Sequence, residues 1–68
     1  MLIRVNGETR EVPQQVSLPE LLRRLAIPRD RVAIELNEKV LRRAEWPAAI
    51  LHEGDKVEIV HFVGGGMP

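Results

Sequence analysis

The sequence predicts an α+β fold in which one helix covers a mixed sheet of four to five strands. Three observations predict it: short apolar runs that alternate with a period of two, one stretch with helical apolar spacing, and turn-forming residues between them. The predicted order is strand, strand, helix, strand, strand, strand. Because the helix has a single apolar stripe, it has to bury that stripe against one face of the sheet.

The N-terminal segment predicts a β-hairpin. Residues 1–5 form its first strand, with apolar side chains at alternate positions on one face. Asn6 and Gly7 follow, a pair that favours the type I′ turn because both central residues of that turn have positive φ. Glu8 to Val12 form the returning strand, and Pro13 ends it because proline cannot donate a hydrogen bond to the ladder.

The next segment predicts a short helix that begins after Ser17. The Ser17 hydroxyl can cap a free backbone amide, and Glu20 is expected to complete a capping box. Pro19 is compatible with the first turn, where a missing N–H loses no bond. The apolar stripe has the spacing i, i+3, i+4 and i+7 and consists of Leu18, Leu21, Leu22 and Leu25. Ile27 and Pro28 are expected to end the helix.

The following segment predicts two more strands and an irregular stretch. Residues 32–36 alternate as a third strand, residues 37–38 form a turn, and residues 39–41 form a short fourth strand. Residues 42–51 are expected to form a turn or a short 3-10 segment, because Trp46-Pro47 interrupts any longer element.

The last strand is the clearest in the sequence, because residues 56–62 are rich in β-branched side chains and follow a turn at residues 53–55. Alternation directs Val60 and Phe62 to the sheet face away from the helix, where Leu2 is expected beside them. An exposed apolar cluster at this end of the chain predicts a docking patch for a partner protein, formed by Leu2, Val60, Phe62 and Val63. Packing at a sheet edge is the alternative interpretation of these residues.

Composition excludes several classes of function. The 68 residues suffice for one domain, expected at residues 1–63 with a flexible tail at residues 64–68, and so small a domain has no room for a deep pocket. Ten basic residues balance ten acidic ones and aromatic side chains are few, unlike typical nucleic-acid binders. The sequence has no Cys and no apolar run long enough to span a membrane. Without a signal-peptide pattern, a cytoplasmic location is expected.

No group of residues has the pattern of an active site. The sequence contains no nucleophile–base pair, metal-binding motif or phosphate-binding loop, so we expect no enzyme activity, no metal site and no bound cofactor. His52 and His61 are interpreted as ordinary turn and strand residues. Trp46 is expected to pack over the end of the sheet. Solvent-exposed positions are expected for Arg23, Arg24, Arg42 and Arg43.

The chemistry of the chain is predicted in its tail, Val63-Gly64-Gly65-Gly66-Met67-Pro68. Three consecutive glycines are costly to order, so we expect them not to pack on the domain. A frayed terminus is one interpretation. The other is an arm that enters a narrow channel of a partner, with a reach of about 13 Å from Val63 to Gly66 at roughly 3.3 Å per residue. An unhindered glycine carboxylate can be adenylated, and a sulfur nucleophile can then displace AMP.

A set of short motifs points to one family. They are Asn6-Gly7, Leu21-Leu22, Leu36-Asn37, Arg43-Ala44-Glu45-Trp46, Glu53-Gly54-Asp55 and, above all, the ending Val57-Glu58-Ile59-Val60-His61-Phe62-Val63-Gly64-Gly65-Gly66. With these motifs the chain resembles, over essentially its whole length, the ThiS family of thiamine-biosynthesis sulfur carriers. The resemblance implies a β-grasp, ubiquitin-like fold.

The resemblance also implies a role in two stages. An E1-like, ThiF-like enzyme would use ATP to adenylate the carboxylate of Gly66, and a cysteine desulfurase or a related donor would supply the sulfur of a thiocarboxylate. A ThiG-like thiazole synthase would then take this sulfur for the thiazole ring of thiamine. ATP, Mg²⁺ and the catalytic groups would belong to these partners, and neither a nucleic acid nor a membrane is implied.

The end of the sequence departs from the family pattern. Family members that are ready for activation end at the glycine corresponding to Gly66, whereas this sequence continues with Met67-Pro68. We expect a processing protease to remove these residues, and a non-native end or an inactive homologue is the alternative. The same fold and ending also fit sulfur carriers for molybdopterin, tRNA thiolation or cysteine synthesis, or an interaction module without tail chemistry.

Overall fold

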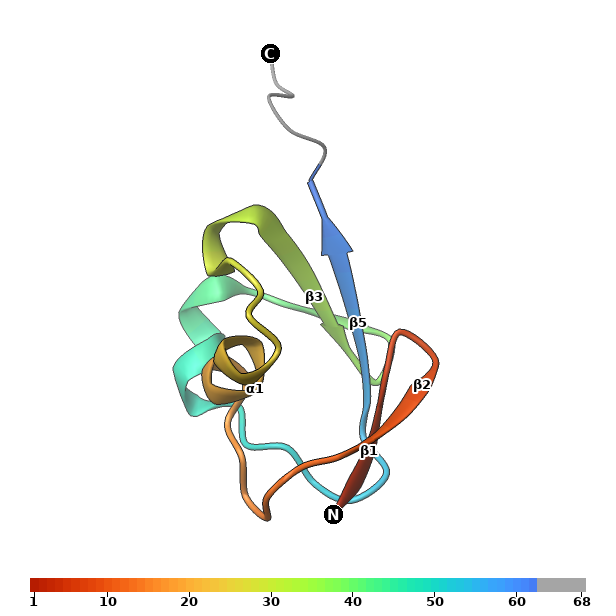
Figure 1. The fold of residues 1–68 in the computed structure, drawn as a ribbon. Helices are drawn as coiled ribbons and strands as arrows, with labels where there is room; N and C mark the ends of the chain where they lie inside the picture. The colour runs from red at the N-terminus through yellow and green to blue at the C-terminus, as the bar shows by residue number, and fades with distance from the viewer. Residues whose placement is uncertain (63–68) are drawn as a thin grey trace.

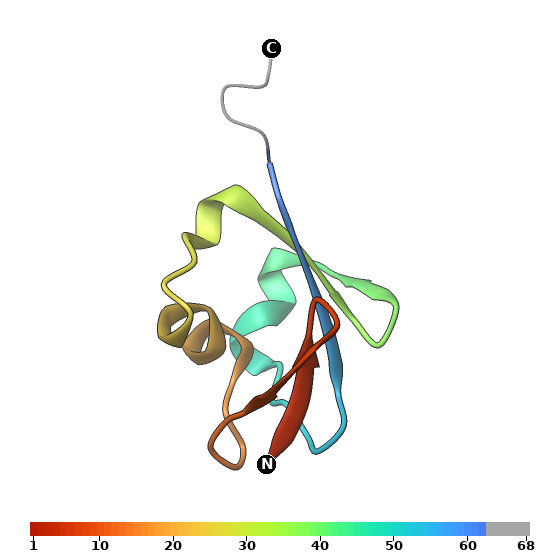
Figure 2. The ribbon, with the colours of Figure 1, turned by 45° about the vertical axis from the view of Figure 1, so that its right-hand side comes forward.

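The computed structural model describes residues 1–62. They form a five-stranded mixed sheet with helices packed on one of its faces (Figure 1). Its elements, in chain order, are β1 (Leu2–Val5), β2 (Glu8–Glu11), α1 (Leu18–Arg24), the 3-10 helix η1 (Arg29–Arg31), β3 (Val32–Leu36), β4 (Lys39–Leu41), the 3-10 helix η2 (Arg43–Ala48) and β5 (Lys56–His61). Figures 1 and 2 show α1 and η2 on the same side of the sheet. The predicted α+β architecture and element order are confirmed.

Strand β5 lies in the centre of the sheet, whose order is β2-β1-β5-β3-β4. It pairs in parallel with β1, with Arg4 beside Lys56, and antiparallel with β3, with Ile34 beside Ile59. The outer strands belong to hairpins, since β2 is antiparallel to β1 and β4 is antiparallel to β3. The most β-branched strand of the sequence is therefore held by a neighbour on each side.

Both hairpins turn through residues with positive φ. Asn6 and Gly7 have φ of 50° and 84°, and Asn37 and Glu38 have φ of 51° and 72°. Such pairs are typical of the type I′ turn, whose twist matches that of the flanking strands. The predicted turns are confirmed at both positions.

The hydrophobic core lies between the sheet and the helical layer. Its buried side chains are Ile3, Val5, Val12, Val16, Leu18, Leu21, Leu22, Val32, Ile34, Trp46, Leu51, Val57 and Ile59. Trp46 of η2 is only 2% exposed, and its Nε1 donates to the carbonyl of Leu41 at 2.9 Å. Leu18, Leu21 and Leu22 of the predicted stripe are buried, whereas Leu25 is the C-cap of α1 and only partly buried against the core. The predicted packing of Trp46 is confirmed.

Helix α1 is capped at its start, but only half of the predicted capping box forms. Ser17 Oγ accepts the backbone N–H of Glu20 at 3.2 Å. The Glu20 carboxylate accepts from Arg23 at 2.6 Å and lies 3.3 Å from Arg24 Nε. The reciprocal half of the box was a wrong prediction, because arginines at i+3 and i+4 compete for this carboxylate.

Helix α1 ends at Arg24, earlier than the predicted stop at Ile27 and Pro28. Ala26 has a φ of 58°, and the backbone N–H of Ile27 donates to the carbonyl of Leu22 at 2.9 Å. This is the bonding of a Schellman ending, in which a left-handed residue terminates the helix. The helix therefore ends at this left-handed residue, before Pro28 and not because of it.

Candidate functional site

The candidate site lies where β5 leaves the sheet. In Figures 1 and 2 this end of β5 lies far from the N-terminus. The last described backbone bond at this end runs from the N–H of Phe62 to the carbonyl of Arg31, at 2.9 Å. Several predicted residues lie outside the described part of the chain. They are Val63 of the predicted docking patch, the predicted arm of Gly64, Gly65 and Gly66, and the two final residues Met67-Pro68.

Two asparagines hold β5 from its two sides. Ile59 donates its backbone N–H to Asn6 Oδ1 at 2.7 Å, and Asn6 Nδ2 donates to the Ile59 carbonyl at 3.2 Å. On the other side, the Lys56 N–H donates to Asn37 Oδ1 at 3.0 Å. Each asparagine comes from a hairpin turn, so the same residue that makes the turn also fixes the strand that carries the predicted arm.

Val60 and Phe62 are exposed on the sheet face opposite the helix, as the alternation predicted. Each is 55% exposed, whereas Val57 and Ile59 on the other face are buried. Across the β3–β5 pair, Val60 lies beside Ala33. The end of β5 therefore presents a small apolar surface directly before the predicted arm.

Leu2 does not lie beside this apolar surface, which corrects the predicted position. It is 47% exposed, but its carbonyl accepts the N–H of Gly54, in the turn that precedes β5. Because β1 runs parallel to β5, the start of one strand meets the start of the other. Leu2 lies two residues before Arg4 and Val60 lies four residues after Lys56, the partner of Arg4, so six residue steps separate Leu2 from Val60, about 20 Å at roughly 3.3 Å per residue.

Charged residues lie between these two apolar ends of the open face. Glu58 lies beside Glu35 of β3, and Lys56 lies beside Arg4 of β1. Lys56 Nζ donates to Glu38 at 2.8 Å, and this bond lowers the pKa of the Glu38 carboxyl and raises the pKa of Lys56. The Glu35–Glu58 pair places like charges on adjacent strands, next to Val60.

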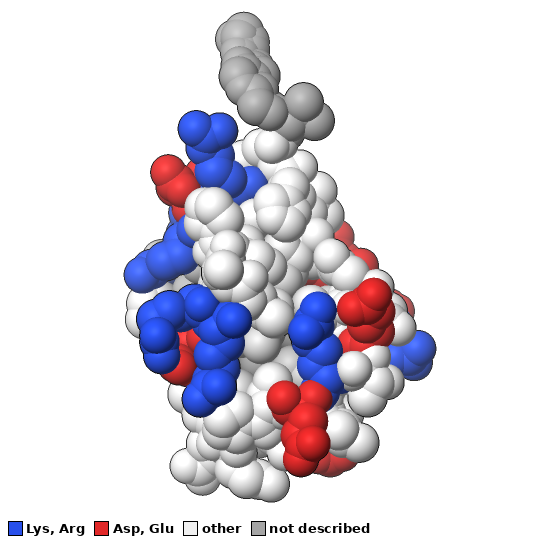
Figure 3. Space-filling model, viewed as in Figure 1, with Lys and Arg blue, Asp and Glu red and all other residues white. Residues whose placement is uncertain are grey.

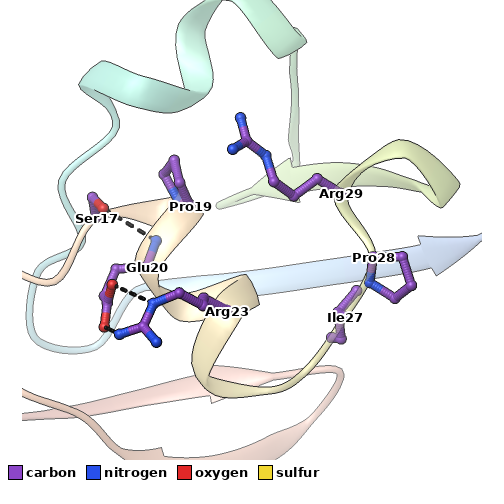
Figure 4. A pocket seen from close by; sticks show the side chains of 7 residues that line it. All are labelled: Ser17, Pro19, Glu20, Arg23, Ile27, Pro28 and Arg29. Carbon is purple, nitrogen blue, oxygen red and sulfur yellow. Dashed lines mark hydrogen bonds and ion pairs between the residues drawn. The ribbon is translucent and has the colours of Figure 1, made fainter.

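The helical side of the molecule carries a groove between α1 and η1. Figure 4 shows its lining, Ser17, Pro19, Glu20, Arg23, Ile27, Pro28 and Arg29, around a volume of about 440 Å³. Arg23 is turned onto Glu20, and this hydrogen bond is the main reason why the pKa of Glu20 is lowered. Figure 3 shows Lys and Arg side chains gathered on this side. The groove holds an ion pair that is already satisfied, and we assign it no chemistry.

The described residues offer no alternative catalytic or metal centre. Within residues 1–62, no three His, Cys, Asp or Glu side chains come together as metal ligands. His61 is exposed at the end of β5, and His52 Nδ1 lies 4.0 Å from Asp55 in a surface turn. No helix of this part of the chain is long and apolar enough to cross a membrane.

Arg43 is solvent-exposed, as predicted, but its side chain also makes contacts that the sequence interpretation did not include. Its guanidinium lies 4.8 Å from the centre of the Trp46 ring and donates to the carbonyls of Arg29 and Val32, the latter at 3.0 Å. The spacing of Arg43 and Trp46, three residues apart in a helical turn, is the sequence signal that could have indicated this contact.

The fold is a mixed sheet packed against one α-helix, with the last strand in the centre of the sheet and three glycines after it in the sequence. This arrangement is typical of β-grasp, ubiquitin-like proteins. The family model described as "ThiS family" matches residues 3–66. This chain belongs to the ThiS family, the sulfur carriers of thiamine biosynthesis. One curated protein that this chain matches over its full length is named a sulfur carrier protein.

Three relatives illustrate the match. The crystal structure of thiamine biosynthesis protein ThiS from Geobacter metallireducens is 36% identical, with a TM-score of 0.84, over 97% of this chain and 100% of that one. Sulfur carrier protein ThiS from Thermus thermophilus is 34% identical over 65 residues, which are 96% of this chain and 100% of that protein. A thiazole synthase from Magnetococcus marinus is 39% identical over 66 residues, 97% of this chain. This chain spans only 20% of that thiazole synthase.

Proposed function

We propose that this chain carries sulfur as a thiocarboxylate on Gly66 and donates it for thiazole formation in thiamine biosynthesis. The observation that carries the proposal is the position of the three glycines directly after β5, the central strand of a fold similar to the solved ThiS structure. A strand held on both sides gives the glycine arm a fixed origin. The absence of side chains lets the arm enter a narrow channel of a partner.

The chemistry takes place in the partners. The Gly66 carboxylate attacks the α-phosphate of ATP in a ThiF-like activating enzyme, and pyrophosphate leaves. A persulfide sulfur, supplied by a cysteine desulfurase or a related donor, attacks the acyl carbon and AMP leaves. A second thiol then cleaves the sulfur–sulfur bond of the acyl persulfide, which releases the thiocarboxylate and leaves a disulfide on the partner side. ATP and Mg²⁺ are bound by the enzyme in this scheme, and the carrier needs no cofactor.

Docking to the partners uses the apolar surface at the end of β5. Val60 and Phe62 supply its described part, and we propose that Val63, which lies outside the described residues, contacts the same partner. Leu2 is a separate exposed residue at the other end of the open face, so we leave it out of the docking surface, and the Discussion gives the test. A ThiG-like thiazole synthase is the proposed acceptor, and the similar region within the thiazole synthase of Magnetococcus marinus supports this pairing.

Activation requires a free carboxylate on Gly66. In this sequence Gly66 is followed by Met67, so its carboxyl group is part of a peptide bond until the chain is cleaved at that point. We propose proteolytic removal of Met67-Pro68 before adenylation. The cytoplasmic location remains a prediction.

The test is to incubate a chain ending at Gly66 with its cognate activating enzyme, ATP and a sulfur donor. Intact-mass measurement should then show the gain expected for exchange of one oxygen for sulfur. The chain that continues to Pro68 is the matched control, and it should show no gain without the protease. A chain ending at Gly66 that stays unmodified would instead favour an interaction module without tail chemistry.

A further inference from the structure

The 3-10 helix η1 has little of its own to hold it in place. None of its residues is buried, no side chain caps its start, and the Arg31 N–H reaches the Pro28 carbonyl at 3.3 Å. Yet the Arg31 carbonyl accepts the N–H of Phe62, the last described bond before the predicted arm. The position at which β5 leaves the sheet therefore depends on η1, whose own residues supply neither a buried side chain nor a capping bond to hold it in place.

Arg43 supplies the missing anchor. Its guanidinium donates to the carbonyl of Arg29 and, at 3.0 Å, to the carbonyl of Val32, so it holds the backbone on both sides of Arg31. The same guanidinium lies over the ring of Trp46, which is buried in the core. A continuous set of contacts thus runs from the buried indole through Arg43 to η1.

We infer that Arg43 is a positioning residue, which fixes the point where the arm leaves the sheet by holding the acceptor of the Phe62 bond. If Arg31 moves and this bond opens, Phe62 leaves the docking surface and the arm begins earlier, at Val60. A carrier in which only a fraction of molecules has Phe62 in place binds its partner more weakly by that fraction. This consequence for binding rests on the proposed function, whereas the anchoring itself does not.

Lysine cannot replace this arginine. The planar guanidinium presents a fork of donors and stacks on an aromatic ring, whereas an ammonium is a compact point charge without that geometry. Arg43→Lys therefore keeps the charge and loses the two-carbonyl grip. The Arg43→Lys variant therefore distinguishes a positioning role, which it removes, from electrostatic attraction to a partner, which it keeps.

Hydrogen exchange in the free protein tests the anchoring directly. The Phe62 amide should exchange about ten-fold faster in Arg43→Lys and in Arg43→Met than in the unmodified chain, relative to the Ile59 amide of the same sample. Ile59 is a suitable reference because its N–H is bonded to Asn6, on the other side of β5. Arg42→Met removes the neighbouring exposed charge and should leave the ratio unchanged. An unchanged ratio in a folded Arg43→Lys protein overturns the inference.

Activation kinetics test the consequence. With a chain ending at Gly66, Arg43→Lys should raise the KM for the carrier several-fold at unchanged kcat, and Arg42→Met should change neither. A merely structural Arg43 would lower Tm without moving KM, and that result would overturn the positioning role. If the unmodified chain forms no thiocarboxylate, the proposed function fails, while the exchange ratio still decides whether Arg43 holds the Phe62 bond.

Discussion

The side-chain amide of Asn6 bonds to both backbone groups of Ile59: its Oδ1 accepts the Ile59 N–H at 2.7 Å, and its Nδ2 donates to the Ile59 carbonyl at 3.2 Å. Strand β1 has already ended at Val5, so the asparagine side chain continues the ladder where the backbone of β1 has turned away. This contact joins the first turn of the chain to its last strand, over a sequence separation of 53 residues. It therefore supports β5 close to the predicted arm.

Replacing Asn6 should destabilise the fold by two separable mechanisms. Asn6→Gly keeps the positive φ but removes both bonds to Ile59, and we expect a loss of about 1–2 kcal/mol. Asn6→Ala removes the bonds and adds the strain of a left-handed alanine, for a further loss of about 1 kcal/mol. Urea unfolding measures both. Equal stability of Asn6→Gly and the unmodified chain would show that the bonds contribute nothing.

Phe62→Asp should weaken binding to the activating enzyme without unfolding the domain. The side chain is 55% exposed, so the free energy of unfolding should change by no more than about 0.5 kcal/mol. Binding should weaken because a carboxylate would have to be buried in an apolar contact. Titration calorimetry with the cognate enzyme gives the affinity, and thermal unfolding gives the stability.

Leu2→Asp is the matched control for this variant, because Leu2 is 47% exposed on the same sheet face but at the start of β5. It introduces the same charge eight residue steps away along the strand direction, which is about 26 Å at roughly 3.3 Å per residue. Unchanged affinity is expected. If Leu2→Asp weakens binding as much as Phe62→Asp, the docking surface extends over the whole open face and the restriction to the end of β5 is wrong.

Ala26→Gly should stabilise the protein. Ala26 ends helix α1 with a φ of 58°, a conformation that glycine adopts without a steric penalty. Relief of about 1–2 kcal/mol of strain is partly offset by the greater freedom of glycine in the unfolded chain, about 0.4–1 kcal/mol. A net gain of about 0.5–1 kcal/mol should appear as a higher urea midpoint. A lower midpoint would contradict the left-handed ending.

Glu20→Gln should flatten the fall of stability in acid. The hydrogen bond from Arg23 lowers the pKa of Glu20 from its ordinary value of 4.5. The unfolded chain lacks this bond and binds more protons below that value, so stability is fully present above it and is lost as the pH falls through the folded-state pKa. Because the pair is exposed, the effect is small and decreases with added salt.

Urea midpoints near neutral pH and at about pH 3 measure this effect. The exposed Glu11→Gln variant serves as the control for removal of one carboxylate. An acid-induced loss as large in Glu20→Gln as in the unmodified chain would show that the Glu20–Arg23 pair does not contribute.

Most of the fold follows from local signals in the sequence. Alternation identifies the strands, and Asn6-Gly7 identifies its turn, because both depend only on near neighbours along the chain. The end of helix α1 was predicted two residues or more too late, since alanine gives no sign that it will adopt the left-handed conformation. Proline was the only stop signal that the sequence offered there.

The candidate site was predicted less completely, because it depends on contacts between distant residues. The exposure of Phe62 follows from alternation, but the position of Leu2 depends on the parallel register of β1 and β5, which no local pattern encodes. The contacts of Arg43 join η2 to η1 and are equally long-range. The spacing of Arg43 and Trp46 could have indicated the contact between these two side chains, but not the bonds from Arg43 to η1.

The central claim is that Gly66 carries the sulfur that reaches the thiazole ring. It is tested most directly by loading the chain ending at Gly66 with isotopically labelled sulfur, and then adding thiazole synthase and its other substrates. The account predicts that the label appears in the thiazole product while the chain returns to the mass of its carboxylate form. Label that remains on the chain, while unlabelled thiazole forms at the same rate, would contradict it.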